Sequence, residues 1–405
     1  MNETMELFLA ILKAALGQTA FSGHISQSQW PALISMATMH KVLPLFYEAV
    51  YHASAPAELK SSVRQQVIAQ TMRTADFLEL NRHLQAAGLR PLVVKGIVCR
   101  ELYPQPDHRP SGDEDLWIRP EQFALCHQLF TEFGMHTAVS GEDLSESFEV
   151  PYRKAGSLLY IELHKHLFPP ESLAYGDLNR FFVQAQDRAI PLQIQGHTIY
   201  TLEYTDHLFY LICHAFKHFL HSGFGIRQVC DIILFANAYG NRVNWQQLWE
   251  NCQAIRAEVF AAAIFRIGSQ YLTFDPQKAG YPQAWQEISV DVLPMLEDLL
   301  CAGVYGSANM SRQHSSTITL DAVAAQKQGK KGKLSVVGSL FPAASKLENL
   351  YPYLKKRPYL LPIAWCSRLW KYIFRRRRKE DDNAADALKI GKERIELMRL
   401  YGILK

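Results

Sequence analysis

Two aspartates separated by one residue, Asp113 and Asp115, are the side chains of this chain best suited to chemistry. They lie in the segment DEDLWI, which reads as a short β-strand. Side chains alternate along a strand, so the two carboxylates point the same way, about 6.6 Å apart along the backbone, and Glu114 points away. Two such carboxylates repel each other, and a shared divalent cation is the usual compensation. The pair predicts a metal site; a solvated turn at a strand end is the alternative.

Magnesium is the cation that this arrangement favours. It prefers one or two carboxylates together with substrate phosphates and water, so the site is completed when a nucleoside triphosphate arrives. Two ions held about 4 Å apart can activate an attacking hydroxyl and stabilise the departing pyrophosphate. We therefore expect Mg²⁺ as cofactor, with two ions, and a nucleoside triphosphate as substrate.

A third carboxylate comes from the later segment YIELH. Tyr160, Glu162 and His164 share one face of this predicted strand, whereas the alternate positions are apolar. A carboxylate on a core strand is costly unless it is paired or bound to a metal. We expect Glu162 to complete the metal site or to take the proton from the acceptor, and His164 to contact the nucleotide. A plain ion pair between Glu162 and an arginine is the alternative.

Groups suited to phosphate flank the aspartate pair. Gly96 ends the predicted strand PLVVKG and opens a helix, where a glycine lets backbone N–H groups approach a phosphate closely. Lys95 can neutralise phosphate charge, and Arg109 offers a planar guanidinium that matches phosphate oxygens. Lys95, Gly96 and Arg109 are therefore predicted to bind the nucleotide.

The elements that position these residues follow the order strand, helix, strand, helix, strand between residues 90 and 168. This order predicts a small mixed sheet with helices on one face, and hence an α+β fold. A helix is expected from Pro120 to about Phe133, because proline and glutamate favour a helix start. Helical periodicity also predicts helices before and after the sheet, at residues 4–16, 28–52, 57–87 and 384–401, with long helices over 205–300.

The chain resembles the uncharacterised bacterial nucleotidyltransferases of the polymerase-beta-like superfamily in two segments, LVVKGIVCRELYPQPDHRPSGDEDLWI and YIELHKHLF. The resemblance implies a palm-like sheet, two magnesium ions and transfer of a nucleoside monophosphate from a triphosphate. It carries Asp113 and Asp115 onto the metal-binding positions and Glu162 onto the third acid. The wider superfamily usually has Gly-Ser in the turn where this chain has Lys95-Gly96.

Three functional hypotheses follow from these residues. The first is a nucleotidyltransferase whose hydroxyl acceptor is a sugar, peptide, protein or RNA. The second is a catalytically silent protein that keeps the fold to bind a nucleotide or a partner, which the departure at Gly96 favours. The third is an RNA-modifying enzyme or toxin that grips its acceptor through basic residues. The expected regions are an N-terminal helical region, the nucleotidyltransferase core, a helical domain, a flexible basic loop and a C-terminal helical and basic tail, at residues 1–88, 89–200, 201–300, 301–345 and 346–405.

A stripe of histidines is predicted on the helix that follows the core. His207, His214, His218 and His221 fall within about 60° of one another at 3.6 residues per turn. Such a stripe can line a nucleotide pocket or hold a transition metal, or it can pack the helix against the sheet. We expect His214 and His218 to face the nucleotide.

Composition limits the remaining possibilities. The 405 residues are 48% hydrophobic and 20% charged, with a formal net charge of +4, so attraction to a polyanion has to be local. The basic run Arg375–Lys379 is the candidate for weak contact with RNA or lipid, and a solvated charge run is equally compatible with it. The seven cysteines are scattered and predict reduced, mostly buried thiols, and no apolar run is long enough to span a membrane. The prediction is a cytoplasmic protein.

Overall fold

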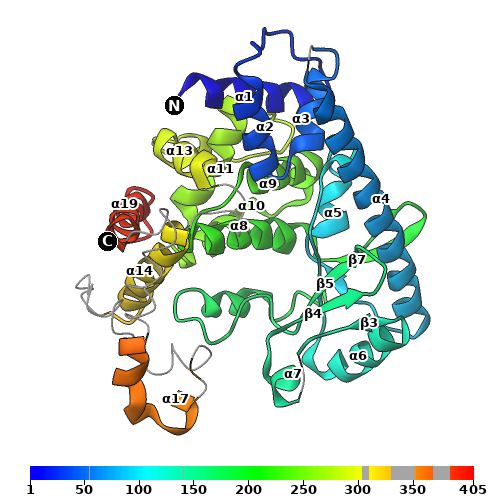
Figure 1. Cartoon of the computed structure of the whole chain (residues 1–405), viewed down its shortest axis with the longest axis vertical. Helices are drawn as coiled ribbons and strands as arrows, with labels where there is room; N and C mark the ends of the chain where they lie inside the picture. Colours follow the sequence, from blue (N-terminus) through cyan, green and yellow to red (C-terminus); the bar gives the residue numbers. More distant parts are fainter. Residues whose placement is uncertain (54, 140, 303–309, 330–350, 352, 368–383) are drawn as a thin grey trace. The chain divides into compact units, whose positions relative to one another are not determined.

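The computed structural model describes the chain except for residues 54, 140, 303–309, 330–350, 352 and 368–383. Figure 1 shows the chain coloured along its sequence. Contacts divide the chain into two compact units. The first contains Met1–Lys217 and Phe224–Val304, and the second contains His218–Gly223 and Tyr305–Lys405. The basic run Arg375–Lys379 lies outside the described residues.

A five-stranded mixed sheet forms the centre of the predicted core and confirms the α+β fold. Its strands in spatial order are β1 Leu92–Val93, β2 Glu114–Trp117, β5 Tyr160–His164, β4 Glu149–Lys154 and β3 Met135–His136. Strands β2 and β5 pair in parallel, and the other neighbours are antiparallel. The three predicted strands thus lie side by side, and the β3 and β4 strands were missed from the sequence.

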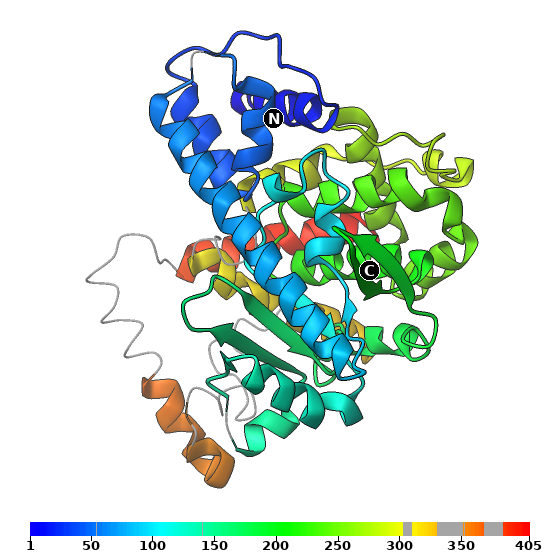
Figure 2. The ribbon, with the colours of Figure 1, turned by 90° about the vertical axis from the view of Figure 1, so that its right-hand side faces the viewer.

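The two faces of the sheet differ in polarity because side chains alternate along each strand. Leu116, Ile161 and Leu163 are buried and belong to the same apolar cluster as residues of the helices α4 and α6. These helices span Ala57–Ala86 and Phe123–Glu132. Both Figure 1 and Figure 2 show α4 running along one side of the sheet. The helices cover one face, as predicted, and leave the acidic side chains on the other.

A separate two-stranded hairpin supports the outer edge of the sheet. Strands β6 Ile190–Ile194 and β7 His197–Thr201 are joined at Gln195 and Gly196, which both have positive φ, at 49° and 79°. Two positive φ values in succession suit a tight hairpin turn. Asn81 and Gln85 of α4 donate side-chain N–H groups to the carbonyl of Thr198, at 3.1 and 2.7 Å. The hairpin is thereby fixed to the helix that supports the sheet.

The helices around the sheet agree with the predicted periodic segments, with one exception. The segment expected as one helix over 28–52 is two helices, because the chain turns at Lys41, whose φ is 53°. The other α-helices of this unit are α1 Glu3–Leu16, α2 Trp30–Met39, α3 Leu43–Val50, α5 Gly96–Arg100, α7 Glu142–Glu146, α8 Tyr204–Leu220, α9 Ile226–Tyr239, α10 Trp245–Ala254, α11 Glu258–Tyr271, α12 Gln283–Gln286 and α13 Leu293–Ala302. Among the described residues of this unit, 3₁₀ turns lie at Pro106–His108, Pro120–Gln122, Gly176–Phe182 and Gly240–Arg242.

The prediction of a loop over residues 301–345 is wrong for residues 310–327, which lie in the second unit. Within that range the structure has the helix α14, Met310–Lys327, which packs along α19, Ala384–Leu400. A Cβ added at Gly391 of α19 would meet Ile318 Cδ1 at 2.9 Å, so the two helices approach closely. Packing against α19 stabilises a segment whose small and polar residues predict a loop. The helix predicted at 384–401 is confirmed, and shorter elements lie at α17 Tyr353–Lys356 and Pro358–Leu360.

Two further findings concern the whole described chain. None of the seven cysteines, which all lie among the described residues, forms a disulfide, and five of them are buried, as the scattered pattern predicts. Within the described residues, no helix combines the length and the apolar character needed to cross a bilayer.

Candidate functional site

The acidic cluster forms where β2 and β5 run side by side. Asp115 on β2 and Glu162 on β5 are partners in the parallel register. Asp115, Glu162 and His164 each offer one ligand atom, and these atoms lie within 4.8 Å of one another. Asp113 immediately precedes β2, so strand alternation puts it on the side of Asp115. The structure thus brings together Asp115, Glu162 and His164, whereas this group of ligand atoms does not include Asp113.

His164 connects the carboxylates of three strands. Its Nε2 lies 3.3 Å from Asp115 Oδ1 and 3.9 Å from Glu162 Oε2. Its Nδ1 lies 3.5 Å from Glu149 Oε2, and Glu149 pairs with His164 across β4 and β5. Sequence reasoning missed Glu149 because β4 itself was missed. The signal was present in the alternation of EVPYRK, but the Pro151 within it argues against a strand.

Negative charge is in excess in this cluster. Burial, and then repulsion by Asp115, Glu149 and Asp113, raises the pKa of Glu162 to about 8. Burial alone would raise the pKa of Asp115, but Lys95 and His164 outweigh it and hold that pKa below its usual range. One carboxyl of the cluster therefore stays protonated near neutral pH, and a bound cation would relieve this repulsion.

A pH dependence of stability follows for the protein without divalent ions. Glu162 keeps its proton in the folded state up to about pH 8, whereas the unfolded chain releases it near pH 4.5. The folded state binds more protons in this interval, so the free energy of unfolding should fall as pH rises from about 4.5 to about 8. Urea unfolding in EDTA at several pH values measures the slope.

The variant Glu162→Gln should flatten this slope, because glutamine carries no charge to bury. Magnesium in excess should flatten it in the wild type by compensating the ionised carboxylate. Glu171→Gln, at an exposed position, is the matched control and should leave the slope unchanged. If the free energy of unfolding depended on pH identically in the wild type and in Glu162→Gln, Glu162 would not be the group that causes this dependence.

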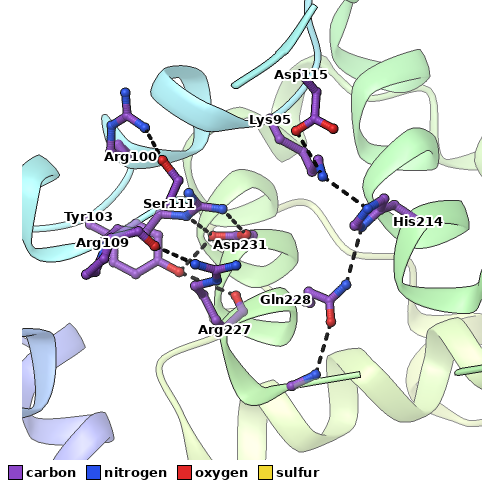
Figure 3. A network of polar contacts seen from close by, with 12 residues as sticks. Lys95, Arg100, Tyr103, Arg109, Ser111, Asp115, His214, Arg227, Gln228 and Asp231 are labelled. Atoms are coloured by element: carbon purple, nitrogen blue, oxygen red, sulfur yellow. Dashed lines mark hydrogen bonds and ion pairs between the residues drawn. The ribbon is translucent and has the colours of Figure 1, made fainter. Parts of the chain in front are cut away.

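Lys95 reaches the cluster from the end of β1. Its Nζ lies 3.0 Å from Asp115 Oδ2 and 3.1 Å from His214 Nε2. Gln228 Nε2 lies 3.3 Å from His214 Nδ1, and Gln228 Oε1 accepts the N–H of Gly225 at 3.0 Å. Figure 3 shows this chain of contacts from Asp115 to α9. Burial would lower the pKa of Lys95, but Asp115, together with Tyr210, Asp113 and Glu162, outweighs burial and raises it, so the ammonium stays charged.

The turn at Gly96 is shaped by Glu114. A Cβ added at Gly96, where φ is 47°, would lie 1.7 Å from Glu114 Oε2, so only glycine fits. The N–H of Ile97 donates to the same oxygen at 2.8 Å, and Arg100 forms an ion pair with the other oxygen. Glu114 points away from Asp115, as predicted, and holds the turn that carries Lys95. The contact of Gly96 with phosphate stays a prediction.

Arg109 has a partner other than the one expected. Its Nε and Nη2 donate to the two carboxylate oxygens of Asp231 on α9, at 2.7 and 2.6 Å. The hydroxyl of Tyr103 donates to the same carboxylate at 2.7 Å. Figure 3 shows this group apart from Lys95 and Asp115. Arg109 thus ties the loop before β2 to α9, and we leave it out of the proposed nucleotide site.

The histidine stripe divides into different environments. His207 is fully buried, with Nε2 2.9 Å from the carbonyl of Val94 and Nδ1 3.1 Å from Thr201 Oγ1. Burial lowers its pKa to about 4, so it packs as a neutral ring. His214 contacts Lys95, whereas His218 and His221 belong to the second unit, so the nucleotide contact of His218 stays a prediction. The cation-ligand group found among the described residues includes none of the four.

The sheet and the acidic cluster together define a class of protein. The acidic-X-acidic segment at the start of β2 and the later acid on the adjacent strand β5 agree with the palm-like sheet that the resemblance implies. In a comparison with protein families, residues 26–273 match the family described as uncharacterised nucleotidyltransferase. The match covers more than half of the chain, which therefore belongs to this nucleotidyltransferase family. Searches of curated proteins and of solved structures gave no match.

Proposed function

We propose that the protein transfers a nucleoside monophosphate from a nucleoside triphosphate to a hydroxyl acceptor and releases pyrophosphate in a magnesium-dependent reaction. The observation that carries this proposal is the meeting of Asp115 and Glu162 in register on adjacent parallel strands. In the proposal, Asp113 and Asp115 hold the metal, and Glu162 is the third ligand or the proton acceptor. Family membership supports nucleotidyl transfer in general.

The donor atoms of the cluster fit magnesium. Its carboxylate oxygens are the ligands that this hard cation prefers. A cation would also oppose the burial and the carboxylate repulsion that raise the pKa of Glu162. Imidazole suits transition metals better than magnesium. We therefore assign His164 the task of orienting Asp115 and Glu149 through its two ring nitrogens.

Each remaining residue then has a task that its position supports. Bound magnesium would polarise the α-phosphate and stabilise charge on the leaving pyrophosphate. Lys95, held between Asp115 and His214, is placed to neutralise phosphate oxygens at the edge of the cluster. The carboxyl group of Glu162, with a pKa near 8, can exchange a proton near neutral pH and so suits the proton-acceptor role.

A silent nucleotide- or partner-binding protein is the second candidate. The ion pair between Lys95 and Asp115 favours it, because the lysine already neutralises one of the metal-binding carboxylates. The use of the Ile97 N–H by Glu114 favours it as well, since that amide is not free for a phosphate. An RNA-modifying activity through Arg375–Lys379 and a cytoplasmic location are predictions that we retain.

The decisive experiment combines binding with turnover. Calorimetry with each of the four ribonucleoside triphosphates, with magnesium and with EDTA, measures binding. Labelled triphosphates are then incubated with the protein and a lysate of its native source, and labelled products and pyrophosphate are identified. Magnesium-dependent labelling together with pyrophosphate supports transfer. Binding of a triphosphate without either product supports the silent protein.

A further inference from the structure

An open groove of about 500 Å³ lies beside Asp113 at the end of the sheet where β2 and β5 begin. Gly112 and Asp113 line it from the loop before β2. Arg153 of β4, Leu158 of the turn between β4 and β5, and Tyr160 of β5 also line it. This volume suits a small ligand or one unit of a polymer. A ligand in the groove would meet the proposed metal ligands at the Asp113 end.

Three cations from three separate elements lie at the groove: Arg153 lines it, and Lys41 and Arg73 lie next to the lining residues Gly112 and Leu158. A Cβ added at Gly112 would lie 3.9 Å from the ammonium of Lys41, which is in the connection between α2 and α3. Arg73 of α4 bridges two sides of the groove, donating Nη1 to the carbonyl of Ser111 at 3.0 Å and Nε to that of Leu158 at 3.1 Å. The guanidinium of Arg153 lies 5.0 Å from the ring centroid of Tyr160, its cross-strand partner.

These cations retain capacity for a ligand. A guanidinium has five N–H groups, and two of those of Arg73 are used by the backbone carbonyls. Lys41 and Arg153 are exposed side chains. Burial, and then the charges of Arg227 and Arg73, lowers the pKa of Lys41 in spite of the opposing effect of Asp113. Positive charge therefore predominates around Gly112, whereas negative charge predominates around Glu162.

The direction of the reaction assigns the groove to one of the two substrates. In phosphoryl transfer the attacking oxygen and the leaving group lie on opposite sides of the phosphorus. Lys95 approaches Asp115 from β1, and β1 and β5 flank β2 on opposite sides. The groove adjoins β5 and β4. A triphosphate bound at Lys95 thus leaves the groove for the attacking molecule.

We infer that this groove binds the acceptor, and that the acceptor carries a phosphate group held by Lys41, Arg73 and Arg153, with its hydroxyl directed to Asp113. The inference rests on the proposed function. A phosphate matches guanidinium and ammonium groups that lie at one groove. A phosphorylated small molecule and the 3′ end of an RNA both offer this chemistry.

The transfer step balances without a further reactant. The acceptor oxygen forms a bond to the α-phosphorus, and the bond from that phosphorus to the oxygen bridging to the β-phosphorus breaks. Pyrophosphate leaves with the electron pair of the broken bond. A bound cation would favour the ionised form of Glu162, and the hydroxyl proton then passes to its carboxylate and from there to water.

Binding measurements test the inference without turnover. The probes are ribose 5-phosphate, its neutral counterpart ribose, and fluorescein-labelled pentauridylate with a free 3′ hydroxyl. The double variant Lys41→Gln/Arg153→Gln removes two exposed groove cations, while Arg73 is kept because it holds backbone carbonyls. Lys60→Gln/Arg64→Gln, at exposed positions of α4, removes the same charge elsewhere and is the matched control.

We expect a phosphate-bearing probe to bind the wild type and the control equally, and to bind the groove variant at least about tenfold more weakly. Ribose should not bind, and ATP should bind all three proteins alike.

Binding of ribose 5-phosphate alone identifies a small-molecule acceptor, and binding of pentauridylate alone identifies RNA. Equal binding of the probes by all proteins, or no binding of either phosphate, overturns the inference. A loss of ATP affinity in the groove variant alone assigns the groove to the donor and also overturns it. If the probes bind as expected but no pyrophosphate is ever released, the proposed transfer fails while the phosphate site stands.

Discussion

Replacing Asp115 by asparagine should lower the rate of nucleotide transfer by at least about a thousandfold while the protein stays folded. Asparagine keeps the shape of the side chain and removes the charge that binds a cation. Asp115 is buried and central, because it contacts Lys95 and His164 and lies in register with Glu162. Loss of this ligand removes the polarisation that a metal supplies in the transition state, which is worth several kcal/mol.

Pyrophosphate release at saturating magnesium and triphosphate measures this effect, with circular dichroism and thermal unfolding as checks on the fold. Asp187→Asn is the matched control, because Asp187 forms an exposed ion pair with Arg119 in the same unit. Its rate should equal that of the wild type. Full activity of folded Asp115→Asn would show that this carboxylate does not hold the metal.

The acidic centre of the site could be predicted because local patterns determine it. Strand alternation alone puts Asp113 with Asp115, and Glu162 with His164, on single faces of their strands. The parallel pairing of β2 and β5 then brings Asp115 and Glu162 together. The strand and helix order predicts a mixed sheet but not this pairing, because β1 and β2 are also joined through a helix and are antiparallel. The same alternation predicted that Glu114 points away from Asp115.

The partners of the charged side chains could not be predicted, because they depend on contacts between distant segments. Arg109 and Asp231 are 122 residues apart, and nothing in either local pattern specifies their contact. A lysine at position 95 has the same suitability for phosphate whether or not it pairs with Asp115, so nothing in the sequence indicates this ion pair. The helix α14 was missed for a related reason, since its packing against α19 stabilises a sequence of weak helical character.

The buried ion pair between Arg109 and Asp231 carries the largest expected effect on stability. Both side chains are at least 95% buried, and the carboxylate accepts two bonds from Arg109 and one from Tyr103. The variant Asp231→Leu leaves the charge of Arg109 buried without compensation. We expect it to lower the free energy of unfolding by about 3–5 kcal/mol. Urea unfolding at neutral pH measures this change.

The double variant Arg109→Met/Asp231→Leu separates the cost of an unpaired charge from the loss of packing. Apolar side chains of similar volume remove both charges, so the double variant should recover most of the stability that Asp231→Leu loses. Asp187→Asn, which breaks the exposed pair with Arg119, should change stability by less than about 1 kcal/mol. A loss for Asp231→Leu as small as that of Asp187→Asn would show that the pair does not hold the loop before β2 to α9. A double variant that recovers its stability also retains this loop, and with it the position of Asp113, so its transfer activity should remain near that of the wild type.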